Sequence, residues 1–379
     1  MKLERVELLH VAIPLVTPFR TSFGTMTSKD TFLLHAVTDE AEGWSEFAAD
    51  PEPLYCSEFV AGAEIVIRDF LLPRVAALPE PTTAAVAPAM ASVKGHELAK
   101  AALETALLDA ELRAYGMSFA TFLGSVHERV PAGVSVGIKS SVPELLDDVE
   151  RYLAEGYLRI KLKIEPGWDV EPVRAVRERF GDALPLQVDA NTAYTLADAE
   201  HLRRLDDFGL LLIEEPLEEN NLHANAQLQK RLATPVCLDE SIHSARDAAS
   251  AIAMDACRVV NVKPARVGGY REARRIHDVA TAHGVPVWCG GMLETGIGRA
   301  PNLALAALPG FTLPGDTSAS GRYFAEDITE PFVLQGGHLP VPTAPGIGID
   351  PLPDALARFT TATRELYVSD AVRTPTGRS

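Results

Sequence analysis

Short apolar runs recur along the middle of the chain, and each of them ends in charged or amide residues. The runs span residues 157–164, 186–191, 211–216, 236–240 and 259–264. The charged residues at their ends are 24 to 26 positions apart and are Lys163, Asp189, Glu214, Asp239 and Lys263. An interval of this length fits one strand, one helix and two short loops, so the pattern predicts repeated βα units of a parallel sheet.

The segments between these runs have the composition and spacing of helices. They predict helices over residues 145–153, 168–180, 196–208, 245–256 and 271–283. Three further apolar runs, at 134–138, 285–291 and 311–318, bring the number of predicted strands to eight. We therefore predict an α/β fold with a closed β/α barrel, whose active site lies at the C-terminal ends of the strands.

The residues on either side of the barrel predict a second unit. Residues 3–15 and 31–48 have the pattern of antiparallel strands, and 57–78 and 97–115 that of helices, with a Pro- and Ala-rich link at 79–88. The tail contains strand-like runs, and we expect it to return to this unit. The predicted division is an α+β capping domain over 1–125, a barrel domain over 126–327, and a returning segment over 328–379.

Composition and charge narrow the class of protein. The chain has 379 residues, 47% of them hydrophobic, which is typical of a globular protein. Its formal net charge of −17 argues against nucleic acid and anionic membranes as partners. No apolar run approaches the ~18 residues of a membrane span. The four cysteines lack C-x-x-C spacing, and the first residues are typical of an edge strand rather than a signal peptide. We therefore expect a cytoplasmic protein with reduced thiols.

Three carboxylates end neighbouring strands of the predicted barrel. Asp189, Glu214 and Asp239 belong to its third, fourth and fifth strands. Acids that converge in this way stay ionised only with a cation among them. Oxygen ligands without His or Cys suit Mg²⁺ or Mn²⁺ better than Zn²⁺. The alternative is a set of separate salt bridges at the barrel rim.

Two lysines end strands that face each other across the barrel mouth. Lys163 ends the second strand and Lys263 the sixth. Residues two apart share a face, so Lys161 points into the barrel with Lys163, and Asn191 points with Asp189. A lysine is a useful base only with a lowered pKa, and both Lys161 and a divalent cation would lower it. A structural ion pair is the alternative for either lysine alone.

These groups together indicate a proton-transfer reaction. A substrate carboxylate on the metal acidifies its α-proton, because the cation stabilises the enediolate that remains. That planar species accepts a proton from either side, so two opposed lysines permit inversion of the α-carbon. Among the weaker signals, segment 18–25 is either a lid or a plain connector. Ser135 either binds substrate or fills the lumen, and Gly291 either lets the backbone approach a ligand or begins a turn.

The motifs also resemble a known family. Lys161-Leu-Lys163, Asp189-Ala-Asn191, Glu214-Glu-Pro, Asp239-Glu240-Ser, 263–269 and 290–296 occur in the order found in the enolase superfamily, muconate-lactonising-enzyme subgroup. The chain is most similar there to the N-acylamino acid racemase (N-succinylamino acid racemase)/o-succinylbenzoate synthase family, over nearly its whole length.

That resemblance implies a capping domain built from both chain ends and a (β/α)7β barrel. It implies Mg²⁺, or Mn²⁺ or Co²⁺, on Asp189, Glu214 and Asp239, and Lys163 and Lys263 as the acid/base pair. It also implies a homo-octamer. The residues implied to support these groups are Lys161, Asn191 and Glu240, and those implied to lie near the substrate are Phe19, Phe23, Ser135, Gly291, Leu293, Asp316 and Tyr323.

Two residues depart from the family's pattern. Glu215 stands where relatives usually have Gln, and we expect its carboxylate to point away from the metal. Asp50 stands where close relatives tend to be apolar, which leaves the acyl-chain preference open.

The expected function is racemisation of N-succinyl- or N-acetylamino acids, small-molecule carboxylates, together with the dehydration that makes o-succinylbenzoate for menaquinone. The alternatives are a dedicated o-succinylbenzoate synthase, a Schiff-base aldolase that uses Lys263 as nucleophile, and a ligand-binding barrel without catalysis.

Overall fold

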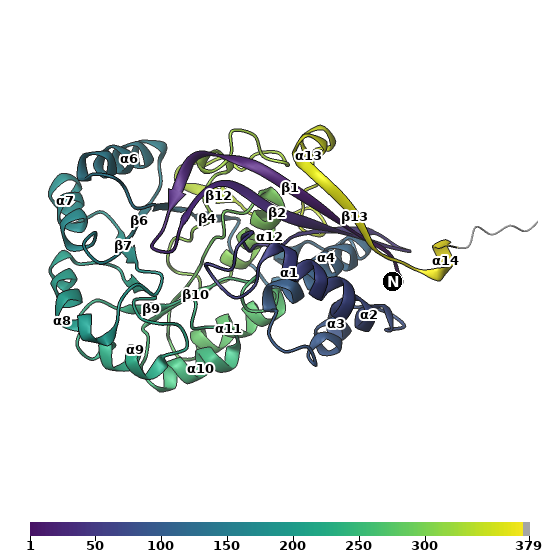
Figure 1. Cartoon of the computed structure of the whole chain (residues 1–379), viewed down its shortest axis with the longest axis horizontal. Coiled ribbons are helices and arrows are strands. Elements are labelled where there is room, and N and C mark those ends of the chain that lie inside the picture. Colours follow the sequence, from purple (N-terminus) through teal and green to yellow (C-terminus); the bar gives the residue numbers. More distant parts are fainter. Residues whose placement is uncertain (374–379) are drawn as a thin grey trace, which may run out of the picture.

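The computed structural model describes residues 1–373. Figure 1 shows two parts, a barrel with helices around it and an antiparallel sheet with helices packed on it. The first and last strands of the chain both belong to the antiparallel sheet, whose order is β13-β1-β2-β3. These strands are β1 (Leu3–Arg20), β2 (Thr25–Thr38), β3 (Glu42–Glu46) and β13 (Thr360–Val368).

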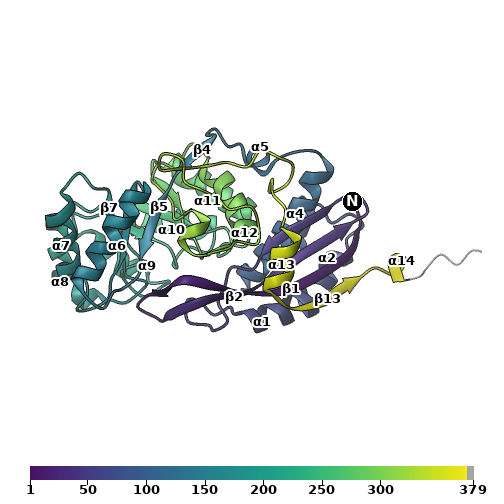
Figure 2. The same cartoon turned by 90° about the horizontal axis from the view of Figure 1, so that it is seen from above.

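The hairpin of β1 and β2 is longer than the alternation of the sequence predicted. The two strands pair from Leu3↔Thr38 to Arg20↔Thr25, with a register shift between Pro14 and Phe19. Residues 18–20, which we expected in a loop, therefore continue β1. Seen from above, the hairpin extends past the rest of its sheet to the barrel (Figure 2). Its tip contacts the barrel, where the carbonyl of Arg20 accepts a hydrogen bond from the amide of Ile138 at 2.9 Å.

Helices on this sheet form a hydrophobic core of their own. Val6, Leu8, Phe32 and Leu34 of the sheet are buried in it together with Leu103 of the long helix α4. The helical segments of this part are α1 (Val60–Val66), the π-helical η1 (Ile67–Leu71), α2 (Leu72–Ala76), α3 (Thr83–Met90), α4 (Glu97–Ala114) and α5 (Phe119–Leu123).

The helix α3 corrects the predicted link over 79–88. Pro88 lies inside this helix, and Val86 and Met90 are buried against the core of the capping part. Alanine has the highest helix propensity, and α3 places its apolar side chains one turn apart. Packing of these side chains therefore outweighs the proline that suggested a linker.

The barrel has seven regular parallel strands, which lie in chain order. They are β5 (Gly133–Val136), β6 (Arg159–Lys163), β7 (Leu186–Asp189), β8 (Ile213–Glu214), β9 (Val236–Leu238), β10 (Val259–Val262) and β11 (Val287–Cys289). The predicted eighth strand closes the ring through isolated bridges, Val287↔Phe311 on one side and Ala132↔Gly315 on the other. Pro314 has no N–H to donate, which accounts for the lack of a regular ladder here. The predicted barrel with an antiparallel capping part is confirmed.

Helices surround the barrel strands, and most lie where the sequence predicted them. They are α6 (Val142–Glu155), α7 (Val170–Phe180), α9 (Leu222–Gln229), α10 (Ala245–Ala253), α11 (Tyr270–Ala282) and α12 (Gly296–Ala306). The predicted helix over 196–208 is instead a sequence of short pieces, η2 (Leu196–Asp198), α8 (Ala199–Leu202) and η3 (Arg203–Phe208), of which η2 and η3 are 3₁₀-helical. Apolar residues occur there at every third position, which fits a 3₁₀-helix as well as an α-helix.

The tail has less strand than its sequence suggested. It follows η4 (Ser320–Arg322) and contains β12 (His338–Pro340), α13 (Pro353–Phe359), β13 and α14 (Asp370–Arg373). β12 pairs with β4 (Arg129–Pro131), next to the barrel, whereas β13 pairs antiparallel with β1.

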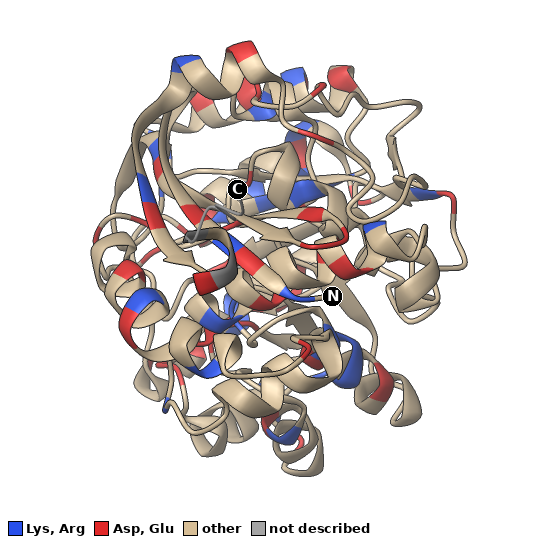
Figure 3. Cartoon of the chain, turned by 90° about the vertical axis from the view of Figure 1, so that its right-hand side faces the viewer, with Lys and Arg blue, Asp and Glu red and all other residues tan. Residues whose placement is uncertain are grey.

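Charged residues of both signs lie among one another on the side of the molecule shown in Figure 3. Within residues 1–373, no helix has both the length and the apolar character needed to cross a membrane. All four cysteines are free thiols, and three of them are buried.

Candidate active site

Parallel pairing brings the acidic strand ends side by side. Lys163 of β6 lies opposite Asp189 of β7, and Asp189 lies opposite Glu214 of β8. Glu214 pairs with Cys237 of β9, two residues before Asp239. The three carboxylates are fully buried at this end of the barrel. Buried charges need partners, and the structure supplies them from three lysines.

Lys163 is held by the last residue of β7 and by a residue in the loop after it. Its Nζ donates to Oδ2 of Asp189 at 2.7 Å and to Oδ1 of Asn191 at 2.6 Å. The side-chain amide of Asn191 donates in turn to Oε1 of Glu240 at 2.9 Å. Asn191 has a φ of 42°, a left-handed conformation that costs energy for a residue other than glycine. A strained loop therefore positions the partner of this lysine.

Lys263 is held by the barrel on one side and by the capping part on the other. Its Nζ donates to Oδ2 of Asp239 at 2.7 Å and to the hydroxyl of Tyr55 at 2.9 Å. The ammonium group also lies 4.7 Å from the centre of the Tyr55 ring. Burial opposes the charge on Lys263, but Asp239 together with Tyr55, Glu240 and Glu214 outweighs it and holds the pKa of the lysine well above its usual value. Arg266 binds the other oxygen of Asp239 at 2.7 Å.

Lys161 lies between several acids. Its Nζ is 2.5 Å from Oδ2 of Asp316, 3.0 Å from Oε2 of Glu214 and 3.1 Å from Oδ2 of Asp189. Burial disfavours its charge, but these acids together raise its pKa well above the usual value. Arg159 contacts the other oxygen of Asp316 at 2.9 Å. The two cations lower the pKa of Asp316 to about 2 despite its burial.

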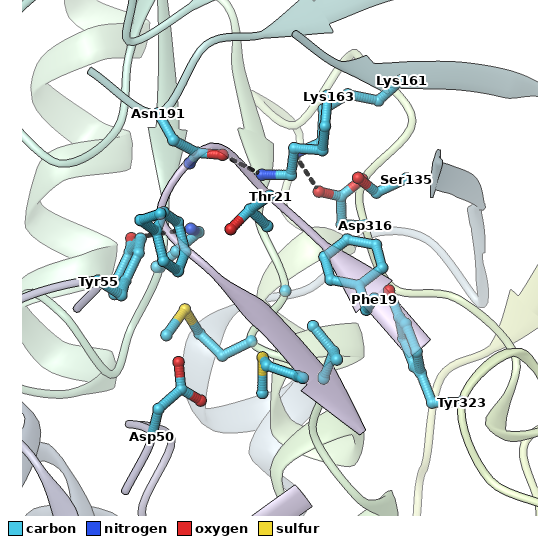
Figure 4. A pocket seen from close by; sticks show the side chains of 16 residues that line it. Phe19, Thr21, Asp50, Tyr55, Ser135, Lys161, Lys163, Asn191, Asp316 and Tyr323 are labelled. Atoms are coloured by element: carbon cyan, nitrogen blue, oxygen red, sulfur yellow. Dashed lines mark hydrogen bonds and ion pairs between the residues drawn. The ribbon is translucent and has the colours of Figure 1, made fainter. Parts of the chain in front are cut away.

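A cavity opens at these strand ends (Figure 4). Most of the residues predicted for the site line it, namely Phe19, Phe23, Ser135, Lys161, Lys163, Asn191, Lys263, Gly291, Leu293, Asp316 and Tyr323. The other predicted residues, Asp189, Glu214, Asp239 and Glu240, are buried behind the lining. Each of these four acids binds a lining residue directly, so the whole predicted set is in one place.

The tip of the β1–β2 hairpin covers part of this cavity. Phe19, Thr21 and Phe23 line it, and the hydroxyl of Ser22 donates to the carbonyl of Ala190 at 3.3 Å. Of the two interpretations of segment 18–25, the structure supports a cover over the site rather than a plain connector.

Two glycines let polypeptide segments approach closely beside the cavity. A Cβ on Gly291 would lie 2.8 Å from the carbonyl oxygen of Asp316. A Cβ on Gly290 would lie 2.4 Å from the side chain of Asn261 and 2.7 Å from Cε of Lys263. Any larger residue at these positions would displace groups of the site.

The residues that could hold a divalent cation are those with oxygen ligands on adjacent strand ends. Burial and the charges of Asp189 and Asp239 raise the pKa of Glu214 well above its usual value, so these carboxylates repel one another. Within residues 1–373 no three acidic, His or Cys side chains point at a common centre. The acids contact the lysine ammonium groups instead, which supply positive charge. The residue types, their strand positions and their mutual repulsion fit a hard divalent cation.

The carboxylate of Glu215 binds the backbone that follows β9 and does not line the cavity. Its carboxylate accepts a hydrogen bond from the amide of Asp239 at 2.7 Å and from the amide and hydroxyl of Ser241. Burial raises its pKa to about 8, although these hydrogen bonds partly offset the effect. Glu215 therefore binds the backbone around the acids rather than the cavity.

Some residues of the site were missed by the sequence analysis. Arg159 has the same strand alternation as Lys161, so that signal was available. Arg266 and Tyr55 lie in loops without a periodic pattern, and only the fold brings them to Lys263. The cavity is also lined by Thr21, Met26, Asp50 and Met292.

Comparison with known proteins agrees with this geometry. Residues 4–124 match the family described as the N-terminal domain of mandelate racemase / muconate lactonizing enzyme, and residues 144–355 match the enolase C-terminal domain-like family. The chain therefore belongs to the enolase superfamily, in its mandelate racemase and muconate lactonizing enzyme group. It is an enzyme, and enzymes of this superfamily use a divalent metal.

Individual relatives are similar over nearly the whole chain. An N-succinylamino acid racemase from an Amycolatopsis species is 64% identical over 362 residues, 96% of this chain and 98% of the relative. An o-succinylbenzoate synthase from Geobacillus kaustophilus is 46% identical, covering 92% of this chain and 94% of the relative. A crystal structure of an enolase superfamily member from Listeria innocua has a TM-score of 0.92 at 40% identity, covering 96% of this chain and 99% of that one. The predicted family is confirmed.

Proposed function

We propose that this enzyme racemises N-acylamino acids, with N-succinyl and N-acetyl derivatives as the substrate class. The observation that carries the proposal is that Lys163 and Lys263 line one cavity from strand ends four positions apart in the barrel. Lysines placed in this way reach a substrate carbon from two sides. The two relatives above are named for N-succinylamino acid racemisation and for o-succinylbenzoate synthesis, which supports this substrate class.

Asp189, Glu214 and Asp239 are the proposed ligands of a divalent cation, Mg²⁺ first, with Mn²⁺ and Co²⁺ as alternatives. When bound, such a cation neutralises these acids and polarises the substrate carboxylate, which lowers the pKa of the α-proton and of the lysines.

The lysines carry the proton in the proposed reaction. One neutral lysine removes the α-proton, and the electron pair that it leaves spreads into the carboxylate. The opposed lysine, still protonated, donates to the other face of the planar carbon. The product has the opposite configuration, and the two lysines have exchanged protonation states, so the reverse reaction uses them in the opposite order.

Other groups of the cavity have supporting roles in the proposal. Asn191 and Glu240 hold Lys163 in position, and Lys161 places positive charge near the substrate carboxylate. Within the described chain, the buried hydroxyl of Ser135 has no hydrogen-bond partner, so it is free to bind substrate. The other proposed substrate contacts are Phe19, Phe23, Gly291, Leu293, Asp316 and Tyr323.

A second candidate activity is the dehydration that yields o-succinylbenzoate in menaquinone synthesis. It begins with the same removal of a proton next to a carboxylate. One lysine suffices as base and then as acid, while the other stabilises negative charge. The name of the Geobacillus relative favours this candidate, as the sole activity or beside racemisation.

The geometry does not favour a Schiff-base aldolase. A Schiff-base mechanism would use Lys263 as the nucleophile, but it gives no role to the buried acids Asp189, Glu214 and Asp239 or to Lys163 on the opposite side of the cavity. Borohydride trapping with a carbonyl substrate, set against loss of activity with EDTA, separates the two mechanisms. A ligand-binding barrel without catalysis would bind N-acylamino acids without exchanging their α-protons.

We further propose that the chain divides into a capping domain of residues 1–125 and 328–379 and a barrel domain of 126–327. We place the enzyme in the cytoplasm as a homo-octamer, as its family resemblance implies.

Proton NMR in D₂O tests the proposed function. The wild-type enzyme with Mg²⁺ is expected to replace the α-proton of N-acetyl- and N-succinylamino acids with deuterium and to form the other enantiomer, and EDTA should stop both. Saturable binding without deuterium incorporation would contradict the proposal.

A further inference from the structure

Asp50 differs from the other charged residues that line the cavity. Lys161, Lys163, Lys263 and Asp316 are all ion-paired to neighbouring side chains. The carboxylate of Asp50 has neither a hydrogen bond nor an ion pair with any residue in the described range 1–373. Figure 4 shows Asp50 at the end of the cavity remote from Lys161, Lys163 and Ser135.

The positive charges nearest to Asp50 are engaged elsewhere. The buried ammonium group of Lys29 donates to the carbonyls of Ala48 and Met292, at 3.2 and 2.9 Å. Lys263 donates to Asp239 and Tyr55. Burial raises the pKa of Asp50, and the attraction of Lys29 and Lys263 only partly offsets this. Asp50 is thus a half-buried acid whose ionised form would be stabilised by a cation in direct contact.

Beyond Asp50 the cavity continues outward into a groove whose ionisable residues are acids. The groove lies between the hairpin tip and the loop after β3, and it shares Phe23, Met26 and Asp50 with the cavity. Its ionisable lining residues are Asp30, Asp50 and Glu52, all acids. A substrate arm that extends from the lysines toward the surface therefore meets negative charge along this route.

We propose that Asp50 selects substrates in which the arm remote from the reacting carbon ends in a cation, an ammonium or guanidinium group. This rests on the proposed function, which places the substrate carboxylate and α-carbon among the lysines. The cation is carried either by a basic amino acid side chain or by an amino-substituted acyl group. An arm that ends in a carboxylate is disfavoured where it reaches Asp50, because two anions would share a half-buried site.

Two pairs of substrates with matched shapes test the proposal through kcat/KM for racemisation. The first pair is N-acetyl-lysine and N-acetyl-2-aminoheptanoic acid, which differ only in the ammonium group of the side chain. The second is N-(4-aminobutanoyl)-methionine and N-pentanoyl-methionine, which differ in the same way in the acyl group. We expect the wild-type enzyme to favour the cationic member of one pair about tenfold, as for a hydrogen-bonded charge pair. The pair that shows the preference identifies the arm that reaches Asp50.

Variants attribute the preference to Asp50. Asp50→Asn should bring the ratio of kcat/KM for the cationic substrate to kcat/KM for its neutral partner close to one. If the second pair is the one that shows the preference, Asp50→Lys should favour N-succinyl-methionine over N-pentanoyl-methionine. Asp182→Asn is the matched control, because Asp182 is exposed and precedes β7 at the opposite end of the barrel. It should keep the wild-type ratio.

Two results would overturn the inference while leaving the proposed function in place. One is racemisation of the neutral substrates with no preference for either cationic partner by the wild-type enzyme. The other is a preference that survives in Asp50→Asn. Absence of racemisation for all these substrates would instead contradict the proposed function itself, and the inference with it.

Discussion

The two lysines of the site occupy corresponding places at the ends of barrel strands, but different parts of the molecule hold them. The partners of Lys163 are Asp189 and Asn191, both from the barrel. Lys263 has one barrel partner, Asp239, and one from a loop of the capping part, Tyr55. The comparison teaches that the direct partners of Lys163 all come from the barrel, whereas Lys263 also takes one from the capping part. Under the proposed mechanism, proton transfer by Lys263 is therefore the half of the reaction that is sensitive to a side chain of the capping part.

The capping part is anchored close to Lys263. Glu46 of β3 accepts hydrogen bonds from the amide of Thr295 at 2.9 Å, from its hydroxyl at 2.6 Å and from the amide of Gly298 at 3.2 Å. These groups belong to the first turn of α12, where free N–H groups favour a carboxylate. An acid of the capping part therefore caps a barrel helix.

Replacing either lysine should have the largest effect on the reaction. Lys163→Ala and Lys263→Ala should each lower the rate of inversion by at least about 10³-fold, because each removes one of the two proton-transfer groups. Polarimetry with a single enantiomer measures this rate. Lys230→Ala, at an exposed lysine that caps α9, should retain wild-type activity. A lysine variant that inverts its substrate at the wild-type rate would show that the two lysines are not both needed.

The anchor at Glu46 predicts a pH dependence of stability. Burial raises the pKa of Glu46 to about 7, although Lys29 and Thr295 partly offset it. The folded protein therefore holds a proton between about pH 4.5 and 7 that the unfolded chain releases, so this group's contribution to stability falls as the pH rises through that window. Its size is at most on the order of 3 kcal/mol. This pH-dependent contribution to the free energy of unfolding should be absent in Glu46→Gln, because the amide oxygen of glutamine still accepts hydrogen bonds but the side chain does not titrate.

Urea denaturation at about pH 5 and pH 8 measures this effect. The free energy of unfolding should fall less between the two pH values for Glu46→Gln than for the wild type. Glu200→Gln, at an exposed acid, should behave like the wild type. An equal fall in all three proteins would mean that Glu46 does not titrate as described.

Removing the hydroxyl of Tyr55 should affect only the half of the reaction that uses Lys263. Tyr55→Phe keeps the aromatic ring under the ammonium group but loses the hydrogen bond at 2.9 Å. We expect about a tenfold slower exchange of the α-proton from one enantiomer and little change for the other. Tyr115→Phe, at an exposed tyrosine, is the control. Equal slowing for both enantiomers would argue against a special link between Tyr55 and Lys263.

The smallest effect is expected for Glu215→Gln. With its pKa raised to about 8, Glu215 holds a proton near pH 7, and glutamine resembles that neutral acid. We expect kcat/KM within about threefold of the wild type at pH 7. Above pH 8 the wild type gains a negative charge on Glu215 beside Asp239, and the variant does not. The ratio of kcat/KM of the variant to that of the wild type should therefore change above pH 8. A large loss of activity at pH 7 would mean that the charge of Glu215 is needed.

Much of the fold could be predicted because its signals are periodic. The recurrence of charged strand ends indicated the barrel, and alternation placed Lys161 with Lys163. Helix type was harder to predict, because the apolar residues of 196–208 recur at every third position and fit two helical forms. Likewise, Pro88 suggested a linker where packing of Val86 and Met90 stabilises a helix.

The site could be predicted only where residues belong to strands or to family motifs. Tyr55 lies in an irregular loop 208 residues before Lys263, and no spacing in the sequence relates the two. The partnerless state of Asp50 was also out of reach, because it depends on where Lys29 and Lys263 direct their hydrogen bonds. Contacts between the capping part and the barrel thus required the structure.

The most direct test of opposed lysines is deuterium exchange from each pure enantiomer of an N-acylamino acid by the two lysine variants. Lys163→Ala retains Lys263 and should exchange the α-proton of one enantiomer only, while Lys263→Ala should exchange that of the other. Exchange of the same enantiomer by both variants, or of both enantiomers by either one, would contradict the account.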